Sequence, residues 1–224
     1  MALSSEQKKI LNDAIKAYRF PPALFDFAKK RAVCLPNMKA VEKQIREDLV
    51  SGNPRRVKNG LSNVIFWGWA QREGRQKYWV NRFRQTVTPK QVRACTNLFS
   101  TRRPPTLQEI KCLNLPSFSG MSFISKIRMF LDPRRSATLD MQLAKLRCVR
   151  PRTILSGLKM PTKQIRITDH NEQIYDDWCK ILVQISKAYF EGRYNAADVE
   201  RGFFHLVQCG SLKQAATILH YADS

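Results

Sequence analysis

The sequence lacks the features that identify membrane and secreted proteins. No run of 18 apolar residues is present, which argues against a membrane-spanning helix. The first twenty residues have the pattern of an amphipathic helix and show no basic head followed by an apolar core, so no secretory signal is expected. Internal repeats and low-complexity segments are also missing. We therefore expect a soluble cytoplasmic protein, associated with the nucleoid if the source is bacterial.

Cysteine pairs are missing as well, because no two cysteines stand in a CxxC arrangement. This spacing argues against a zinc site or a thioredoxin-type redox pair, and free buried thiols are the expected state. The six cysteines are Cys34, Cys95, Cys112, Cys148, Cys179 and Cys209. The histidines, His170, His205 and His220, lie far apart, and the chain has no nucleophile elbow and no glycine-rich phosphate loop. We expect no metal and no cofactor.

Acidic residues are scarce. The chain has 39 Lys and Arg against 18 Asp and Glu, a net charge of +21, while 43% of its residues are hydrophobic. A basic chain with this apolar content is expected to fold rather than to form a disordered tail. Its field attracts polyanions, of which nucleic acid is favoured over a membrane surface. Residues 101–166 carry fourteen cations and just three acids, which concentrates the positive charge there.

Helical periodicity dominates the pattern of apolar residues. Thr106 and Glu109 have the spacing of a capping box, as do Ser4 and Gln7, and Pro89 suits a first helical position. Apolar residues at helical spacing predict helices over 4–18, 38–49, 57–65, 89–99, 107–113, 123–130, 174–189, 197–208 and 211–221. Residues 152–168 alternate like a strand, but Gly157 and Pro161 reduce them to a loop or a short ribbon.

We therefore predict an all-α protein that forms one domain over residues 1–224. Within it we expect two packed helical subdomains with a cleft between them. Residues 54–150 would form one subdomain, and residues 1–53 together with 151–224 would form the other.

The segment LPSFSGMSFISKIRMFLDPRRSATLD, residues 115–140, carries the candidate chemistry. A short apolar helix, a tight turn and a second helix form a helix-hairpin-helix pattern. Such a turn lets the backbone N–H groups of the second helix approach a DNA phosphate. After it, Asp140 precedes a further apolar run and is expected at a helix N-terminus, where free N–H groups favour the carboxylate. The alternatives are an ordinary αα-hairpin and a plain helix cap.

This order of elements resembles the helix-hairpin-helix DNA glycosylases, and most closely the bacterial 8-oxoguanine-DNA-glycosylase-like branch. LPSFSGM followed by FLDPRRSATLD fits the family pattern without a gap over about residues 107–146. The resemblance implies that Asp140 is the catalytic carboxylate. Ser117 stands where the family has its first glycine, and Met121 or Ser122 stands where lyase-competent members have lysine. A monofunctional enzyme is therefore implied.

Other residues have predicted supporting roles. Lys126, on the second helix of the predicted hairpin, is the one lysine within reach of the hairpin and is a candidate catalytic residue, since any lyase activity would have to come from it. The alternative is a phosphate contact or a solvated cation. The candidate base pocket, each member of which could instead be core, is Phe66, Trp67, Trp69, Phe118 and Phe123. The candidate DNA contacts are Ser117, Ser119, Gly120, Met121, Ser122, Arg102, Arg103, Arg128, Arg134 and Arg135, with Lys126 also a backbone-neutralising candidate.

The predicted activity is excision of a flipped base from duplex DNA by a protein expected to be a monomer. A carboxylate beside C1′ stabilises the positive charge that develops on the sugar as the base leaves. Oxidised guanine is the substrate that the resemblance implies, and a modified base of phage DNA fits the same chemistry. A non-catalytic helix-hairpin-helix protein that binds DNA or RNA is the alternative from another class.

Overall fold

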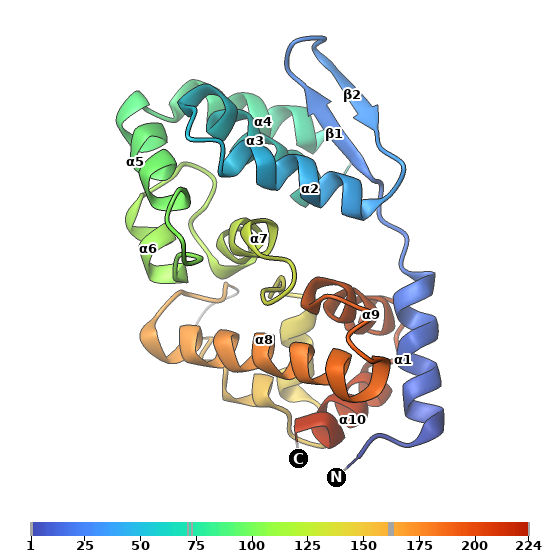
Figure 1. Cartoon of the computed structure of the whole chain (residues 1–224). Coiled ribbons are helices and arrows are strands. Elements are labelled where there is room, and N and C mark those ends of the chain that lie inside the picture. The colour runs from blue at the N-terminus through green and yellow to red at the C-terminus, as the bar shows by residue number, and fades with distance from the viewer. Residues whose placement is uncertain (1, 71, 73, 161–163, 224) are drawn as a thin grey trace. The chain divides into compact units, whose positions relative to one another are not determined.

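α-Helices make up most of the computed structural model, which describes residues 2–70, 72, 74–160 and 164–223 (Figure 1). This confirms the predicted helical class, with a small two-stranded sheet as the exception. The elements in chain order are α1 (Ser5–Ala17), β1 (Ala23–Asp26), β2 (Arg31–Cys34), α2 (Met38–Leu49), α3 (Pro54–Gly68), α4 (Arg75–Thr86), α5 (Pro89–Phe99), α6 (Leu107–Cys112), α7 (Met121–Leu131), η1 (Leu143–Cys148), η2 (Ile154–Gly157), α8 (Asp169–Phe190), α9 (Ala196–Gln208) and α10 (Leu212–Asp223).

Capping residues begin several helices where the sequence predicts them. The Ser4 hydroxyl accepts the Gln7 N–H at 3.1 Å while the Gln7 side chain accepts the Ser4 N–H, and Thr106 and Glu109 repeat this capping box at α6. Pro89 occupies the first turn of α5. These contacts satisfy N–H groups that have no partner inside the helix, so the ends of the helices are fixed locally.

The β1–β2 hairpin is an element that the sequence analysis missed. Ala23 pairs with Cys34 and Asp26 with Arg31 in antiparallel register, and the Asp26 carboxylate accepts two N–H groups in the turn. Of its eight strand residues, Leu24 alone is buried. A strand with so little apolar alternation gives almost no periodic signal.

Two other segments also depart from the predictions. The sequence analysis gave no helix over α4, which buries just Val80 and Phe83 and so lacks an apolar stripe. In residues 152–168 the described part holds the 3₁₀ helix η2 and no strand, and residues 161–163, with Pro161, lie outside the described residues.

The chain groups into two compact units. Unit 1 comprises Met1–Tyr18, Gly120–Ser125 and Pro133–Ser224, and unit 2 comprises Arg19–Ser119 and Lys126–Asp132. α7 contributes its first residues to unit 1 and its last residues to unit 2. The subdomain boundaries predicted from the sequence, at 53/54 and 150/151, do not coincide with this division.

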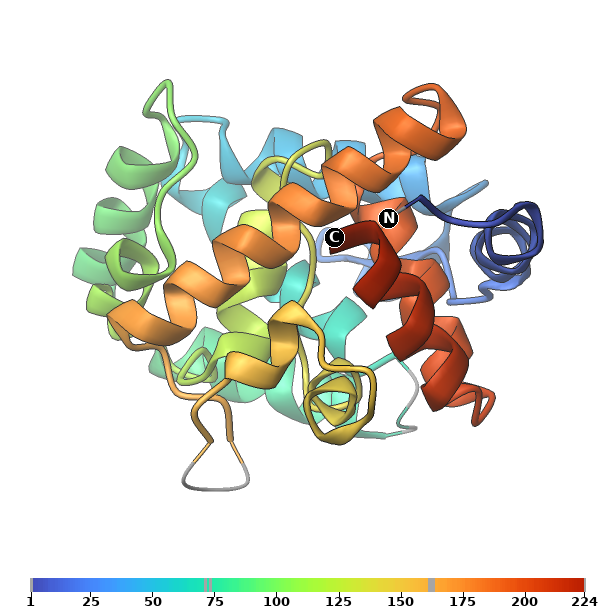
Figure 2. The ribbon, with the colours of Figure 1, turned by 90° about the horizontal axis from the view of Figure 1, so that it is seen from below.

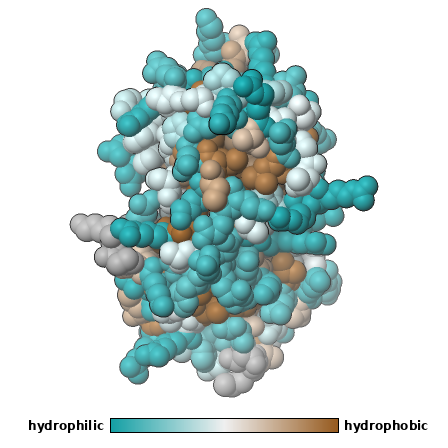
Figure 3. Space-filling model, turned by 90° about the vertical axis from the view of Figure 1, so that its left-hand side faces the viewer, coloured by the Kyte–Doolittle hydropathy of each residue, from teal (hydrophilic) through white to brown (hydrophobic). Residues whose placement is uncertain are grey.

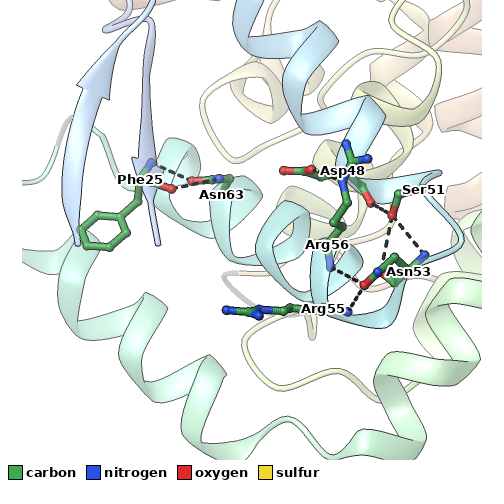
Figure 4. A network of polar contacts seen from close by, with 7 residues as sticks. All are labelled: Phe25, Asp48, Ser51, Asn53, Arg55, Arg56 and Asn63. Atoms are coloured by element: carbon green, nitrogen blue, oxygen red, sulfur yellow. Dashed lines mark hydrogen bonds and ion pairs between the residues drawn. The ribbon is translucent and has the colours of Figure 1, made fainter. Parts of the chain in front are cut away.

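In unit 2, α2 and α3 pack closely and the hairpin is tied to α3 (Figure 4). A Cβ on Gly60 would lie 3.1 Å from the Leu49 side chain, so the glycine permits the close approach. The side-chain amide of Asn63 accepts the Phe25 N–H at 2.8 Å and donates to its carbonyl at 3.3 Å. Asn53 caps α3 by accepting the N–H groups of the next two arginines.

In unit 1, α1 packs on α9 and α8 lies beside η2 (Figure 2). A Cβ on Gly202 would lie 2.6 Å from Ile15, so α1 and α9 approach each other where no side chain intervenes. The stripe predicted on α8 is buried except at Tyr189, which is half-buried, and Trp178 and Leu182 are completely buried. No helix within the described residues is both long and apolar enough to cross a membrane.

Candidate functional site: a capped carboxylate and a basic surface

The predicted pair of helices around the hairpin is present as α6 and α7, joined by residues 113–120. The Phe118 N–H donates to the Leu115 carbonyl and closes a turn within this connection. Ser117 has a φ of 68° and Asn114 a φ of 47°. Both angles lie in the left-handed region that glycine adopts most easily. Ser117 thus takes a glycine-like conformation at the position where the resembling family has its first glycine.

The start of α7 differs from the expected open phosphate site. Met121 is completely buried and its N–H donates to the carbonyl of Ile165 at 3.2 Å. Gly120 is also buried, with its Cα facing the side chain of Gln164, where a Cβ would lie 2.1 Å from Nε2. Ser119 is exposed and Ser122 half-buried. Of the predicted hairpin contacts, Ser117, Ser119 and Ser122 therefore retain exposed surface, whereas the N–H of Met121 already has a partner.

Buried hydrogen bonds from α8 hold the segment that precedes Asp140. The Tyr175 hydroxyl donates to the carbonyl of Ala137 at 2.8 Å, and Trp178 Nε1 donates to the carbonyl of Thr138 at 3.3 Å. Both side chains are completely buried. Because a buried backbone carbonyl needs a hydrogen-bond partner, these two donors fix the path of the segment across α8.

A third contact comes from α7. The hydroxyl of Ser125, itself completely buried, accepts the N–H of Leu139 at 3.1 Å. Three successive residues before Asp140 are therefore each bound by a side chain of unit 1. The sequence analysis missed all three of these anchoring side chains. Their signal was a polar atom on an otherwise apolar helix face, since buried Tyr and Trp usually find a partner for their O–H or N–H.

Asp140 lies just before η1, which begins at Leu143 and is a 3₁₀ helix rather than the predicted α-helix. Its Oδ1 accepts the N–H groups of Gln142 at 2.9 Å and Leu143 at 3.2 Å. Within the described residues its Oδ2 has no hydrogen bond and no ion pair, and the side chain is half-buried. One carboxylate oxygen thus caps the helix while the other is available to a ligand.

Unit 1 also holds two of the predicted DNA-contacting arginines. Arg134 and Arg135 are exposed and lie between α7 and Asp140. The backbone of this loop is fixed, because the N–H groups of Ala196 and Ala197, in the first turn of α9, donate to the carbonyls of Arg134 and Pro133. The loop therefore presents two cations from a fixed backbone.

Three of the five candidate base-pocket aromatics lie in the core of unit 2. Their exposed fractions are 3–4%, and each contacts another ring. The pairs are Phe66 with Phe25, Trp67 with Phe20 and Phe130, and Phe118 with Phe83. Packing between aromatic rings accounts for their burial, which is the core alternative that the sequence left open. Trp69 and Phe123 are half-buried and keep some exposed surface.

Lys126 is 7% exposed and belongs to unit 2. Protein therefore covers most of this residue. Arg128 is half-buried, whereas Arg102 is exposed. Arg103, also exposed, forms a bidentate ion pair with Glu109, which lowers the pKa of that carboxyl to about 2 through the hydrogen bond from its guanidinium. Arg103 thus already has an anionic partner.

Cysteines and histidines form no metal centre in the described part of the chain, where no group of three or more His, Cys, Asp or Glu is placed to hold an ion. All six cysteines are free thiols. The expectation that they are buried holds for Cys95 and Cys179 and is wrong for the other four, which are exposed. Those four lie at or near the ends of helices and strands, where apolar spacing does not predict burial.

A cavity of about 360 Å³ lies in unit 2 beside the hairpin, with Phe25, Asp48 and Asn63 in its lining. Its polar groups are engaged within the protein, since Asn63 binds the backbone of Phe25 and Asp48 accepts from Arg56 at 3.0 Å (Figure 4). Desolvation by burial raises the pKa of Asp48 above its ordinary value. These contacts join α2, α3 and the hairpin, so we assign the cavity a structural role.

The surface is largely hydrophilic on the face that carries α5 and α6, where hydrophobic atoms show through in smaller areas (Figure 3).

Comparisons of the chain with protein-family models, with curated proteins and with solved structures find no match. The resemblance to the helix-hairpin-helix glycosylases thus remains a prediction that rests on the motif in residues 107–146.

Proposed function

We propose that this protein is a DNA glycosylase that hydrolyses the N-glycosidic bond of a damaged or modified base, with Asp140 as its catalytic carboxylate. The observation that carries the proposal is the state of Asp140. Its Oδ1 accepts hydrogen bonds from two backbone N–H groups, and its Oδ2 has no hydrogen bond or ion pair within the described residues. Three buried hydrogen bonds fix the residues before it. The net charge of +21 supports a polyanionic substrate.

The chemistry follows from the charge that develops on the sugar. As the C1′–N bond lengthens, the deoxyribose takes on oxocarbenium character, and a carboxylate placed near C1′ stabilises it. The same carboxylate orients a water molecule. The water oxygen bonds to C1′ as the C1′–N bond breaks, and the proton that the water loses neutralises the departing base. The target nucleotide first has to leave the stack, at a cost of a few kcal/mol that is smallest for damaged bases.

The proposed enzyme is monofunctional. A lyase needs an amine that attacks C1′, and the positions where lyase-competent members of the resembling family have lysine carry Met121 and Ser122. Lys126 is the amine nearest along the chain and is 7% exposed. Oxidised guanine and a modified phage base remain the two candidate substrates, with repair and antiphage defence as the corresponding roles.

The test is incubation with duplexes that carry single modified bases, followed by alkali. Strand breaks that require alkali would support a monofunctional glycosylase, and Asp140→Asn should abolish them while leaving DNA affinity and melting temperature unchanged. Nicking without alkali, trapped by borohydride and lost in Lys126→Ala, would instead make Lys126 a nucleophile.

A non-catalytic binder of DNA or RNA is the second candidate, and the capping bonds of Asp140 favour it because they give the carboxylate a structural role. Under this alternative the wild type releases no base from any duplex, and Asp140→Asn binds nucleic acid as the wild type does.

A further inference from the structure

Two tryptophans from neighbouring segments stack at the surface of unit 2. Trp69 directly follows α3 and Trp79 lies in α4, and their rings are 5.6 Å apart with planes 8° from parallel. Both keep exposed surface. Tyr78 meets the Trp79 ring edge-on at 5.2 Å, and 58% of Tyr78 is exposed. The three rings form a row that the core of unit 2 does not enclose.

Three exposed arginines accompany this aromatic row. The guanidinium groups of Arg72 and Arg75 lie 5.6 and 5.9 Å from the ring of Trp69, and that of Arg82 lies 5.2 Å from the ring of Trp79. In the described part of the chain, none of the three forms an ion pair with a carboxylate. Cation–π attraction holds each guanidinium beside a ring, so positive charge and aromatic surface occupy the same place.

We propose that Trp69, Tyr78, Trp79 and these arginines form a binding surface for single-stranded DNA. Aromatic side chains can stack on the faces of unpaired bases, and arginines beside them can neutralise the phosphates between those bases. In a duplex the base faces are covered by neighbouring pairs, so rings on a protein surface cannot reach them. The choice of DNA over RNA rests on the proposed glycosylase function, whereas preference for an unpaired strand rests on the aromatic–arginine row alone.

The surface gives unit 2 a role separate from Asp140, which belongs to unit 1. Enzymes that act on a base either extrude its nucleotide from the duplex or take a strand that is already unpaired. A surface for unpaired bases would favour DNA regions that are already open, independently of which base is modified.

Tyr78 is the best position for a test, because a substitution at so exposed a side chain should not disturb folding. Affinity is measured by fluorescence anisotropy with a labelled, unmodified oligothymidylate of about 16 nucleotides. Tyr78→Ala should weaken binding by about 5-fold or more, the lower end of the effect of losing one stacked base, while Tyr78→Phe should bind as the wild type does. Equal affinity of Tyr78→Ala and wild type would overturn the proposal.

The role of the arginines is tested by measuring how the affinity for the oligonucleotide depends on salt concentration. Arg82→Ala should make the slope of log K against log salt shallower by about 0.7, the value for one phosphate contact on a single strand. Arg193→Ala is the matched control, since Arg193 is exposed, belongs to unit 1 and removes the same charge. The same change of slope in both variants would show a general charge effect and would count against the surface.

Tryptophan fluorescence gives a readout that structural damage would not mimic. Trp67 and Trp178 are buried, so quenching by oligothymidylate should come from Trp69 and Trp79 and should largely disappear in Trp79→Leu. Equal quenching by a duplex, or tighter binding of an RNA of the same length, would overturn the assignment to single-stranded DNA. Because the oligonucleotide is unmodified, this result is independent of whether Asp140 releases a base.

Discussion

The hydroxyl of Tyr175 in α8 donates to the carbonyl oxygen of Ala137 at 2.8 Å, and both residues are completely buried. Ala137 lies three residues before Asp140, so this bond connects the longest helix of unit 1 to the segment that presents the carboxylate. A buried carbonyl that loses its side-chain donor keeps the penalty of desolvation.

Tyr175→Phe is therefore expected to lower the free energy of unfolding by about 1–3 kcal/mol, because the carbonyl of Ala137 loses its donor. Each kcal/mol should lower the melting temperature by about 2–4 °C in a domain of this size, which thermal melts can measure. If Asp140 is catalytic, base release should slow as well, at unchanged DNA affinity.

The control is Tyr194→Phe, in which the lost hydroxyl donates to Asn12 at 2.8 Å in a part-buried position of the same unit. We expect this variant to lose at most about 1 kcal/mol, since water can replace the partner. Equal destabilisation of the two variants would contradict a special role for the bond to Ala137.

The hydrogen bonds that Asp140 accepts predict different stabilities for its alanine and asparagine variants. Asp140→Ala removes the acceptor for the N–H groups of Gln142 and Leu143 and should destabilise the protein by about 0.5–2 kcal/mol. Asp140→Asn keeps an acceptor oxygen and should remain within a few tenths of a kcal/mol of wild type. Urea denaturation followed by circular dichroism measures both values, and the prediction fails if asparagine and alanine destabilise alike.

The Arg103–Glu109 pair predicts a dependence of stability on pH. The pKa of Glu109 falls from 4.5 to about 2, so its contribution is fully present above pH 4.5 and is lost as the pH falls towards 2. The side chains of Arg103 and Glu109 are 65% and 34% exposed, so solvent screening keeps the contribution of this pair small.

Glu109→Gln keeps an oxygen for the capping box and removes the charge. Its melting temperature should lie a few degrees at most below that of wild type at pH 7. The melting temperatures of the two proteins should converge as the pH falls towards about 2.5. Arg103→Gln should give a smaller difference of the same sign, because Glu109 keeps its hydrogen bond from the Thr106 N–H. A gap that persists unchanged at low pH would contradict the assignment to this ion pair.

Thiol labelling tests the environments of the cysteines. Burial raises the pKa of Cys95 to about 12, so almost no reactive thiolate is present at pH 8. An aromatic disulfide reagent should react quickly with the exposed Cys34, Cys112, Cys148 and Cys209, and with Cys95 and Cys179 only after denaturation. Cys34→Ser should reduce the fast phase by one thiol, and rapid labelling of Cys95 in the native protein would contradict its burial.

Much of the helical structure could be predicted because its signals are local. The capping box of Ser4 and Gln7 and the buried stripe of α8 each lie within a few turns of sequence, and both are present. The β1–β2 hairpin and helix α4 could not be predicted in this way. Their residues are mostly exposed or half-buried, and what holds the hairpin is a bond from Asn63, 38 residues beyond Phe25.

The candidate site, too, was predictable only where its signals are local in the sequence. The position of Asp140 before a helix follows from its neighbours in sequence, whereas its anchors on α8 lie about 40 residues away. Periodicity predicts that these side chains are buried but does not say which residues they contact. The stacked pair of Trp69 and Trp79 was missed for a related reason, since it joins the end of one helix to another across a turn. The identity of α7 as the second hairpin helix was predictable, but its division between two units was not.

That division of α7 has a consequence for any attempt to dissect the protein. The chain passes between the units four times, after residues 18, 119, 125 and 132, and one of these passages falls inside a continuous helix. No single cut yields either unit as an intact fragment, because separating them would sever hydrogen-bonded turns of α7. The side chains that anchor the segment before Asp140, the carboxylate itself and the aromatic row are therefore best studied by point substitution in the chain of 224 residues.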